Sequence, residues 1–454
     1  MAAHKILTMF LKQSTSAVYS LLIFCLSIFP SLLFAQEEKA DSLLQDATLD
    51  KVVEYALVHQ PVVQQAQIDE EITNKIIKGK LADWFPQINS AYNYQHFTEL
   101  QSSVIGGNLI RFGVENTSNI QFTATQNIFN RDVLLASGTA SKVRIQADQN
   151  TSRTKIDVVV GVTKAFYDVL ATSQQIKVSE ESIVRLQRSL KDAHSRYTSG
   201  VADKTDYKRA TILLTNTQAA LKSNTEQLKF KMEYLKTLMG YPVNAQLDIL
   251  YDTLRMESEV AFDTLQELKY SEHIDYKILY TQKELQNANI KYSNWAFFPT
   301  IFASGAYNIN YQSNAFRELF DKRYPYSYVG ATLQFPIFQG GKRLAKVQEQ
   351  KWTGRRLDWG LQNLQSILNT EYTRAMSSYK SNLATYLAQR ENVELAREVY
   401  DIIQLQYKNG IRAYLDVTIA ESDLRTTRIN YFNALYQVLA SKMDVQRALG
   451  QINY

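Results

Sequence analysis

The sequence predicts a mainly helical protein with a smaller β-strand portion, built from two copies of one unit. Three observations support this fold class. Two stretches of about 65 residues contain no proline and space their apolar residues as helices do. Two pairs of shorter segments alternate apolar and polar residues with the period of a β-strand. The same order of segments recurs about 210 positions later in the chain.

The first 35 residues have the order of a secretory signal peptide. Two lysines precede an apolar run at 18–34, and a small residue and acidic residues follow it. A single membrane anchor is the alternative, but the run lies at the very start and is short for a spanning helix. The only cysteine, Cys25, follows the large Phe24, which argues against a lipoprotein cleavage site. We therefore expect a signal peptide at 1–35 and an exported chain without disulfides.

The first copy begins with two helical segments. Thr48 precedes a short helical pattern that Pro61 closes. A second helix, polar over much of its surface, is expected over 62–83. It ends before Pro86, because proline disfavours a helical conformation in the residue that precedes it.

Strand periodicity follows these helices. Residues 87–97 and 120–128 alternate aliphatic or tyrosine side chains with small or amide-bearing ones. We expect two strands of about ten residues, each with one apolar face and one uncharged polar face. The intervening residues 101–116 are polar and contain glycine, so we expect a loop there.

A very long helix and a returning helix complete the first copy. A helix over 131–197 would be roughly 100 Å long. Its last part spaces apolar residues alternately by three and four, which is the seam of a coiled coil. After a glycine corner at Gly200, the returning helix carries an apolar residue at every seventh position and ends at Gly240.

The second copy repeats this order. Its seam residues lie 210 positions after their partners, as Tyr407 lies after Tyr197. We therefore assign a first repeat to 36–240, a linker to 241–262 and a second repeat to 263–454. In the second repeat we expect a short helix at 265–270, a polar helix at 274–295, a strand at 300–311, a strand at 327–335 with Val329, Ala331 and Leu333 opposite Ser327, Gly330 and Thr332, a long helix at 341–407 and a last helix ending at Gly450.

Four strands of this kind cannot close a barrel alone. Open strand edges are excluded from hydrocarbon, and the smallest membrane barrels have about eight strands. If the strands meet lipid, protomers must pool them, and three protomers would supply twelve. The alternative is a small soluble sheet packed on helices. Export, tyrosine-rich strand ends and the absence of disulfides favour the membrane alternative, with the helices stacked side by side into a tube.

Composition and motifs argue against several other classes. Charged residues make up 21% of the chain, so a polytopic helical membrane protein is not expected. The net charge of +5 is small beside 50 basic and 45 acidic side chains, and nucleic acid is not an expected partner. The histidines are scattered, and Gly340-Gly341-Lys342 lacks the full spacing of a phosphate loop, so it is interpreted as a strand-to-helix turn. We expect no enzyme activity and no catalytic, cofactor or metal site.

One motif with the spacing Tyr-x-x-Gly-x5-Asp occurs twice. The copies are Tyr197, Gly200 and Asp206, and Tyr407, Gly410 and Asp416. A glycine that ends one helix just before another begins forms a helix-turn-helix corner.

With these corners in place, the chain resembles the TolC-like outer-membrane efflux and secretion channels. The resemblance covers nearly all of the chain after the signal peptide. It rests on the aromatic-proline steps before the strands, on Pro336-Ile337-Phe338 after one strand, on the closing Leu-Met-Gly and Ala-Leu-Gly, and above all on the doubled corner.

The resemblance implies a homotrimer with a twelve-stranded β-barrel in the outer membrane of a Gram-negative bacterium and a helical barrel in the periplasm. The channel would conduct substrates passively from an inner-membrane transporter and a periplasmic adaptor, in tripartite efflux or type I secretion. Selection of the cargo would rest mostly with those partners. The alternative is an exported coiled-coil structural or adhesive protein without a pore.

The resemblance also implies two roles for the corners, which would form the periplasmic tip. A tyrosine hydroxyl or a guanidinium can bond a carboxylate, so Tyr407–Asp206 and an arginine–acid pair are the expected latches. Ile419 stands where family members often carry a second acid, so an apolar constriction fits as well as a cation-sensitive one. Asp203 is expected to cap a helix or to be a solvated charge. The implied docking residues are Arg196, Tyr197, Gly200, Val201, Tyr407, Gly410 and Ile411, and the implied gate residues are Asp206, Tyr407, Arg412 and Asp416.

Overall fold

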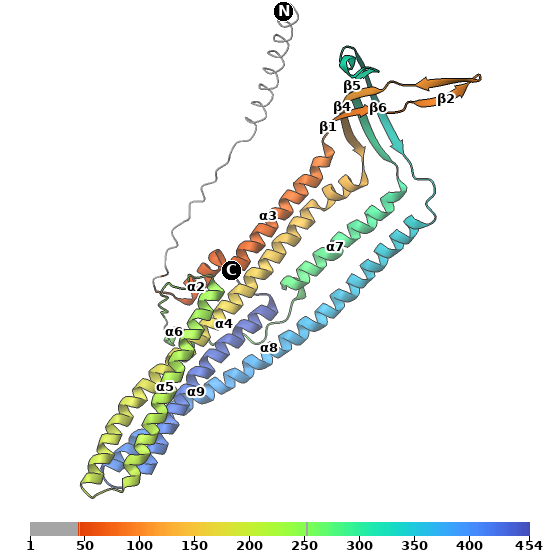
Figure 1. The fold of residues 1–454 in the computed structure, drawn as a ribbon. Coiled ribbons are helices and arrows are strands. Elements are labelled where there is room, and N and C mark those ends of the chain that lie inside the picture. The colour runs from red at the N-terminus through yellow and green to blue at the C-terminus, as the bar shows by residue number, and fades with distance from the viewer. Residues whose placement is uncertain (1–43, 45, 251–252) are drawn as a thin grey trace, which may run out of the picture. The chain divides into compact units, whose positions relative to one another are not determined.

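The computed structural model describes residues 44, 46–250 and 253–454, so the expected signal peptide at 1–35 lies outside the described residues. The described helices and strands belong to one compact unit, Gln45–Tyr454. Within this unit the helices run side by side, a sheet lies at one end, and two helix-turn-helix corners lie at the other (Figure 1). No helix in the described ranges has an apolar stretch long enough to cross a bilayer.

The first half of the unit follows the predicted order, and polar side chains fix where its helices begin. The Asn130 side chain accepts a hydrogen bond from the Asp132 N–H at 2.8 Å, which caps the first turn of the long helix. The elements are α2 (Leu49–His59), α3 (Pro61–Leu81), η1 (Ala82–Trp84), β1 (Gln87–His96), β2 (Gln101–Ile105), β3 (Asn108–Phe112), β4 (Asn116–Phe129), α4 (Arg131–Thr198) and α5 (Lys204–Met239).

The second half repeats this order and ends with one helix of 67 residues followed by one of 36 residues. Its elements are α6 (Thr253–Ser258), η2 (Tyr270–Glu272), α7 (Ile274–Asn294), η3 (Trp295–Phe297), β5 (Thr300–Ser313), η4 (Phe316–Glu318), β6 (Arg323–Gln334), α8 (Lys342–Lys408) and α9 (Tyr414–Leu449).

The four predicted strands form one antiparallel sheet in the order β1-β4-β5-β6, so the two repeats meet at β4 and β5. Its register keeps the two faces separate, because Phe122 lies opposite Tyr307 and Gln121 lies opposite Asn308. The predicted face of Ser327 is wrong. Strict alternation along β6 puts Ser327 opposite Tyr307, on the apolar face.

The predicted loop at 101–116 is also wrong, because it contains the hairpin β2–β3. Gly106 and Gly107 have φ of 59° and 87°, as a two-residue hairpin turn requires at both central positions. A Gly-Gly pair is a preferred two-residue hairpin turn, so this pair is the sequence signal of a hairpin rather than of an irregular loop.

The short helix predicted at 265–270 does not form. These residues make a turn that leads to η2, and Leu265 is 88% exposed. Such a short helix depends on tertiary packing, and the exposed Leu265 supplies none. The short helix α6 lies within the predicted linker instead.

Each repeat ends in a glycine that packs against the backbone near the beginning of the same repeat. Gly240 ends α5 with φ of 68°, and Gly450 ends α9 with φ of 73°. A β-carbon on Gly240 would lie 2.6 Å from the His59 carbonyl oxygen, and one on Gly450 would lie 2.8 Å from that of Glu272. Both positions therefore need glycine for the left-handed backbone and for the close approach.

Gly240→Ala and Gly450→Ala should therefore lower the free energy of unfolding more than Gly200→Ala does. All three positions have positive φ, which costs a residue with a β-carbon about 1–2 kcal/mol. Only Gly200 has open space for the added atom. Chemical denaturation of the three variants measures the difference, and equal losses would contradict the close approach.

Candidate functional site at the helical corners

The first corner joins α4 to α5 through Gly200, which has φ of 74°. The Gly200 N–H donates to the Tyr197 carbonyl at 3.0 Å, and the Val201 N–H donates to that of Arg196 at 2.9 Å. This pair of bonds is the Schellman ending, in which glycine satisfies carbonyl groups that the last turn leaves free.

The second corner joins α8 to α9 with the same geometry. Gly410 has φ of 75°, and its N–H donates to the Tyr407 carbonyl at 3.0 Å. The Ile411 N–H donates to the Gln406 carbonyl at 2.9 Å. Each corner presents an aliphatic side chain to solvent, since Val201 is 73% exposed and Ile411 is 71% exposed. The two corners therefore form matched tips in their backbone and in Val201 and Ile411, but the predicted docking residue Tyr407 is buried, with 7% exposure.

The corners differ in how the next helix begins. The Asp203 side chain accepts a hydrogen bond from the Thr205 N–H at 2.7 Å, so the interpretation of Asp203 as a helix cap is confirmed. This bond holds the pKa of the Asp203 carboxyl below its usual value. Ala413 occupies the same place in the second corner and has no side chain to cap α9.

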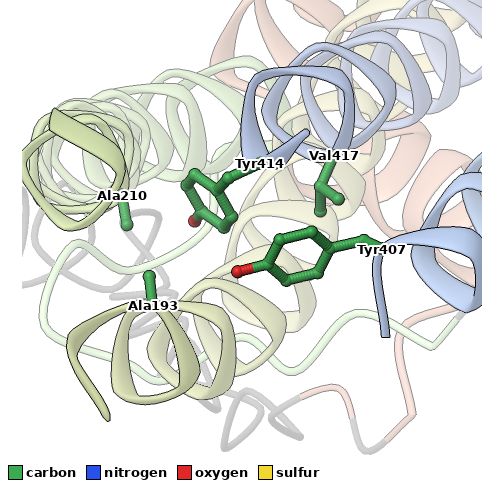
Figure 2. Close-up of a cluster of buried hydrophobic side chains, with 5 residues drawn as sticks. All are labelled: Ala193, Ala210, Tyr407, Tyr414 and Val417. Atoms are coloured by element: carbon green, nitrogen blue, oxygen red, sulfur yellow. The ribbon is translucent and has the colours of Figure 1, made fainter. Parts of the chain in front are cut away.

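A small buried cluster supports both corners from behind (Figure 2). The rings of Tyr407 and Tyr414 meet edge to face, with centroids 5.5 Å apart. Val417 packs against them, and Ala193 of α4 and Ala210 of α5 are wholly buried. Alanine lets the helices approach closely, so the two corners share one core.

Arg196 links the first corner to the second. Its guanidinium lies 4.7 Å from the centroid of the Tyr407 ring and donates to the Lys408 carbonyl at 3.3 Å. The Tyr407 hydroxyl is buried and has no hydrogen-bond partner among the residues that the structure describes. Burial raises the pKa of this hydroxyl, Arg196 opposes the rise, and the Asp206 carboxylate adds to it.

The predicted gate residues lie near one another but are not latched across the helices. Asp206 is close enough to act on Tyr407, yet no hydrogen bond joins them in the described part of the chain. Arg412 lies in the corner itself, 3.7 Å from Asp416 in the first turn of α9, and donates to the Gln406 side chain at 3.2 Å. The latches therefore stay predictions.

Ile419 lines a groove of about 240 Å³ between α5 and α9. Ile212 and Leu213 lie on the other side of this groove, together with Arg209. None of the described residues that line it is acidic. The position expected to carry a second acid thus lies in apolar surroundings beside a guanidinium.

Sequence reasoning missed the buried ion pair that joins the repeats above the corners. Glu421 of α9 is 3% exposed and accepts two hydrogen bonds at 3.0 Å from Arg185 of α4 and one at 2.7 Å from Ser182. Burial alone would lower the pKa of Arg185, but Glu421 raises it overall. The available signal was a carboxylate on the apolar stripe of α9, between Val417 and Leu424.

Nothing at the corners has the chemistry of a metal or cofactor site. Across the described ranges, no group of three His, Cys, Asp or Glu side chains could hold a metal ion. The exposed Val201 and Ile411 side chains are suited to contacts with another protein.

Comparison with known families gives a match across both repeats. The family model described as "Outer membrane efflux protein" matches residues 52–241 and 281–451, which include both corners.

Two curated relatives are similar along most of their length. The outer membrane protein TolC of Escherichia coli is 20% identical over 444 residues, which cover 94% of this chain and 87% of that protein. The outer membrane protein OprJ of Pseudomonas aeruginosa is 22% identical over 425 residues, which cover 90% of this chain and 85% of that protein.

Solved structures share the fold. The outer membrane protein VceC of Vibrio cholerae superimposes with a TM-score of 0.70 at 14% identity, covering 88% of this chain and 96% of that one. CusC gives a TM-score of 0.72 at 16% identity, covering 90% of this chain and 95% of that one. The predicted fold class, long helices with a smaller sheet portion, is confirmed.

Glu421→Ala should destabilise the unit by about 3 kcal/mol, because it leaves the half-buried Arg185 without its carboxylate. Glu421→Gln keeps an acceptor for Ser182 and should cost less. Thermal or chemical unfolding measures both. Thr211, which occupies the corresponding position in α5, supplies the control, and a loss in Thr211→Ala as large as that in Glu421→Ala would contradict this role of the ion pair.

Proposed function

Because this chain belongs to the outer membrane efflux protein family, we propose that it works as a homotrimeric duct docked on a periplasmic adaptor. The chain is an outer-membrane exit duct of an efflux system, with a periplasmic helical portion, and it is not an enzyme. This membership replaces the alternative of an exported coiled-coil protein without a pore. We keep the division into a signal peptide at 1–35, repeats at 36–240 and 263–454, and a linker at 241–262.

The open edges of the sheet support a trimer most directly. Both edge strands, β1 and β6, are exposed along their whole length, and their outer ladder groups have no strand partner among the described residues. In a bilayer such groups must be paired, and closure by three copies gives a barrel of twelve strands.

The helices also leave a face for a second copy. On α8, Leu395, Val399 and Ile402 form a stripe spaced by four and three, and each is more than half exposed. Tyr197 is 36% exposed, whereas Tyr407, its counterpart, is 7% exposed beneath Arg196. Tyr197, whose ring lies 5.2 Å from that of Tyr207, thus keeps exposed surface with which it could contact another protomer.

The matched tips support docking of an adaptor. Gly200 and Gly410 have open space around them, and the neighbouring Val201 and Ile411 are the exposed apolar contacts. Three protomers would present six such tips at the periplasmic end. A partner with a helical hairpin of similar tip geometry could contact them end to end.

A weak gate fits the same end. The Arg412–Asp416 pair is exposed, and exposed pairs contribute about 0–1 kcal/mol. The buried Tyr407 hydroxyl is a hydrogen-bond donor without an acceptor among the described residues. In the proposed trimer, Asp206 or a group of the next protomer would accept this hydrogen bond. With Ile419 in the adjoining groove, the proposed constriction is apolar rather than an acidic ring.

Gly200→Glu or Gly410→Glu should abolish export while leaving assembly and membrane insertion intact, because a bulky charge would block the docking tip. Export is measured in cells that carry the cognate adaptor and transporter, and docking is measured by site-specific crosslinking to the adaptor. Gly200→Ala is the matched control, since it shares the backbone strain but adds neither bulk nor charge. Normal crosslinking of the glutamate variants would refute docking at these tips.

Tyr407→Phe combined with Arg412→Ser should raise the leak conductance of the assembled channel in a planar bilayer. Losing latches worth about 1 kcal/mol would raise the open population about fivefold. Tyr197→Phe, whose hydroxyl belongs to the more exposed tyrosine, is the control. Unchanged conductance of the double variant would contradict the proposed latch.

A further inference from the structure

A cavity of about 500 Å³ lies where the sheet meets the helices. It is bounded by the end of α7, the start of β5, the end of β6 and the starts of α4 and α8. Four basic side chains line it, and none of its described lining residues is acidic. These basic residues are Arg131, Lys342, Arg343 and Lys346.

The four cations are not equally occupied. The Arg131 guanidinium lies over the Tyr292 ring, 4.7 Å from its centroid. Arg343 donates to the carbonyls of Ala296 and Ile337 at 3.3 and 3.1 Å, so it holds the junction together. Lys346 forms an exposed pair with Glu349 at 2.6 Å, which contributes little. The Lys342 ammonium has no hydrogen bond or ion pair within the described ranges. The cavity therefore offers positive charge that the protein itself leaves uncompensated.

The two repeats differ at this point. In the first repeat, the Asn130 side chain caps α4, and Asp132 adds a negative charge to its first turn. In the second repeat, the N-cap of α8 is Gly341, which has no side chain to cap the helix. No acidic residue lies in the first turn of α8. A helix start favours negative charge, so the second repeat leaves room for an anion where the first supplies its own oxygen atoms.

The surface beside the cavity is apolar. Ile337 and Phe338 are 86% and 87% exposed, and Phe298 and Phe335 are each more than half exposed. Exposed apolar residues beside a basic cavity match a ligand with a negative head and hydrocarbon chains, and they have no role in binding a free anion.

We propose that this cavity binds the phosphate-bearing head group of an anionic glycerophospholipid, with its acyl chains lying over Ile337 and Phe338. The inference rests on the proposed function, because that function places the sheet in a bilayer and the cavity at its periplasmic border. In this proposal Lys342, Lys346 and Arg131 contact the phosphate. The Lys342 N–H already donates to the Gln339 carbonyl at 3.1 Å, so the N–H groups that follow it in the first turn of α8 are the backbone donors left for the ligand. The bound lipid then connects the sheet to the start of the longest helix of the second repeat.

The test uses the full-length protein, purified in non-ionic detergent and examined by native mass spectrometry with added phosphatidylglycerol. Phosphatidylcholine with the same acyl chains and inorganic phosphate serve as the other probes. Lys342→Gln with Lys346→Gln should weaken phosphatidylglycerol binding about 30-fold, since each basic residue near an anionic head group contributes a factor of about five. Lys351→Gln with Arg356→Gln, on α8 but outside the cavity, is the matched control.

The expected result is one phosphatidylglycerol per protomer, lost in the first double variant and kept in the control. Equal binding of phosphatidylcholine, equal binding by both double variants, or occupation by inorganic phosphate alone would overturn the lipid site. Channel conductance is recorded on the same preparations. A conducting protein without lipid binding refutes this inference alone, whereas a protein that does not conduct refutes the proposed function.

Discussion

The unpaired edges of the four-stranded sheet constrain the rest of the molecule. A strand that faces hydrocarbon must have its N–H and C=O groups paired, and β1 and β6 leave one side of each ladder open within a single chain. The central pair β4–β5 already joins the two repeats, so in the proposed trimer the remaining edges pair with those of other copies. If the sheet closes in this way, the helices that leave it also stand side by side in a ring. In the proposed assembly, the shape of the periplasmic portion would thus follow from backbone hydrogen bonding in the membrane portion.

Much of this fold could be predicted from the sequence because single residues dictate it. Gly200 and Gly410 occupy left-handed positions that other residues adopt only at a cost, and the glycine therefore identifies each corner. The long helices were predicted from periodicity and the absence of proline. The hairpin at Gly106-Gly107 differs from the predicted loop, because polar residues with glycine occur in irregular loops as well as in hairpins, and only the adjacent glycine pair distinguishes the two.

The parts that could not be predicted depend on which helix lies next to which. Glu421 is a buried ion-pair partner only because α9 packs against α4, where Arg185 and Ser182 lie within hydrogen-bond distance of it. The same holds for Tyr407, since its burial comes from Arg196 and Ala193 on another helix. Repeat symmetry in the sequence places Tyr197 and Tyr407 at matched positions. The tertiary structure makes their burial unequal, with Tyr197 36% exposed and Tyr407 7% exposed.

The duplication gives the two repeats the same backbone features, and the proposed lipid site lies where the two copies differ. The repeats share their corner bonds and their C-terminal glycines, which hold the chain in shape. They differ at two helix starts, each of which has a side-chain cap in the first repeat and none in the second. Asn130 caps α4 while Gly341 leaves α8 uncapped, and Asp203 caps α5 while Ala413 leaves α9 uncapped. In both cases the second repeat has the unsatisfied helix start. Because a helix start without a side-chain cap leaves N–H groups for other acceptors, an anion can bind at these two starts more readily than at their capped counterparts.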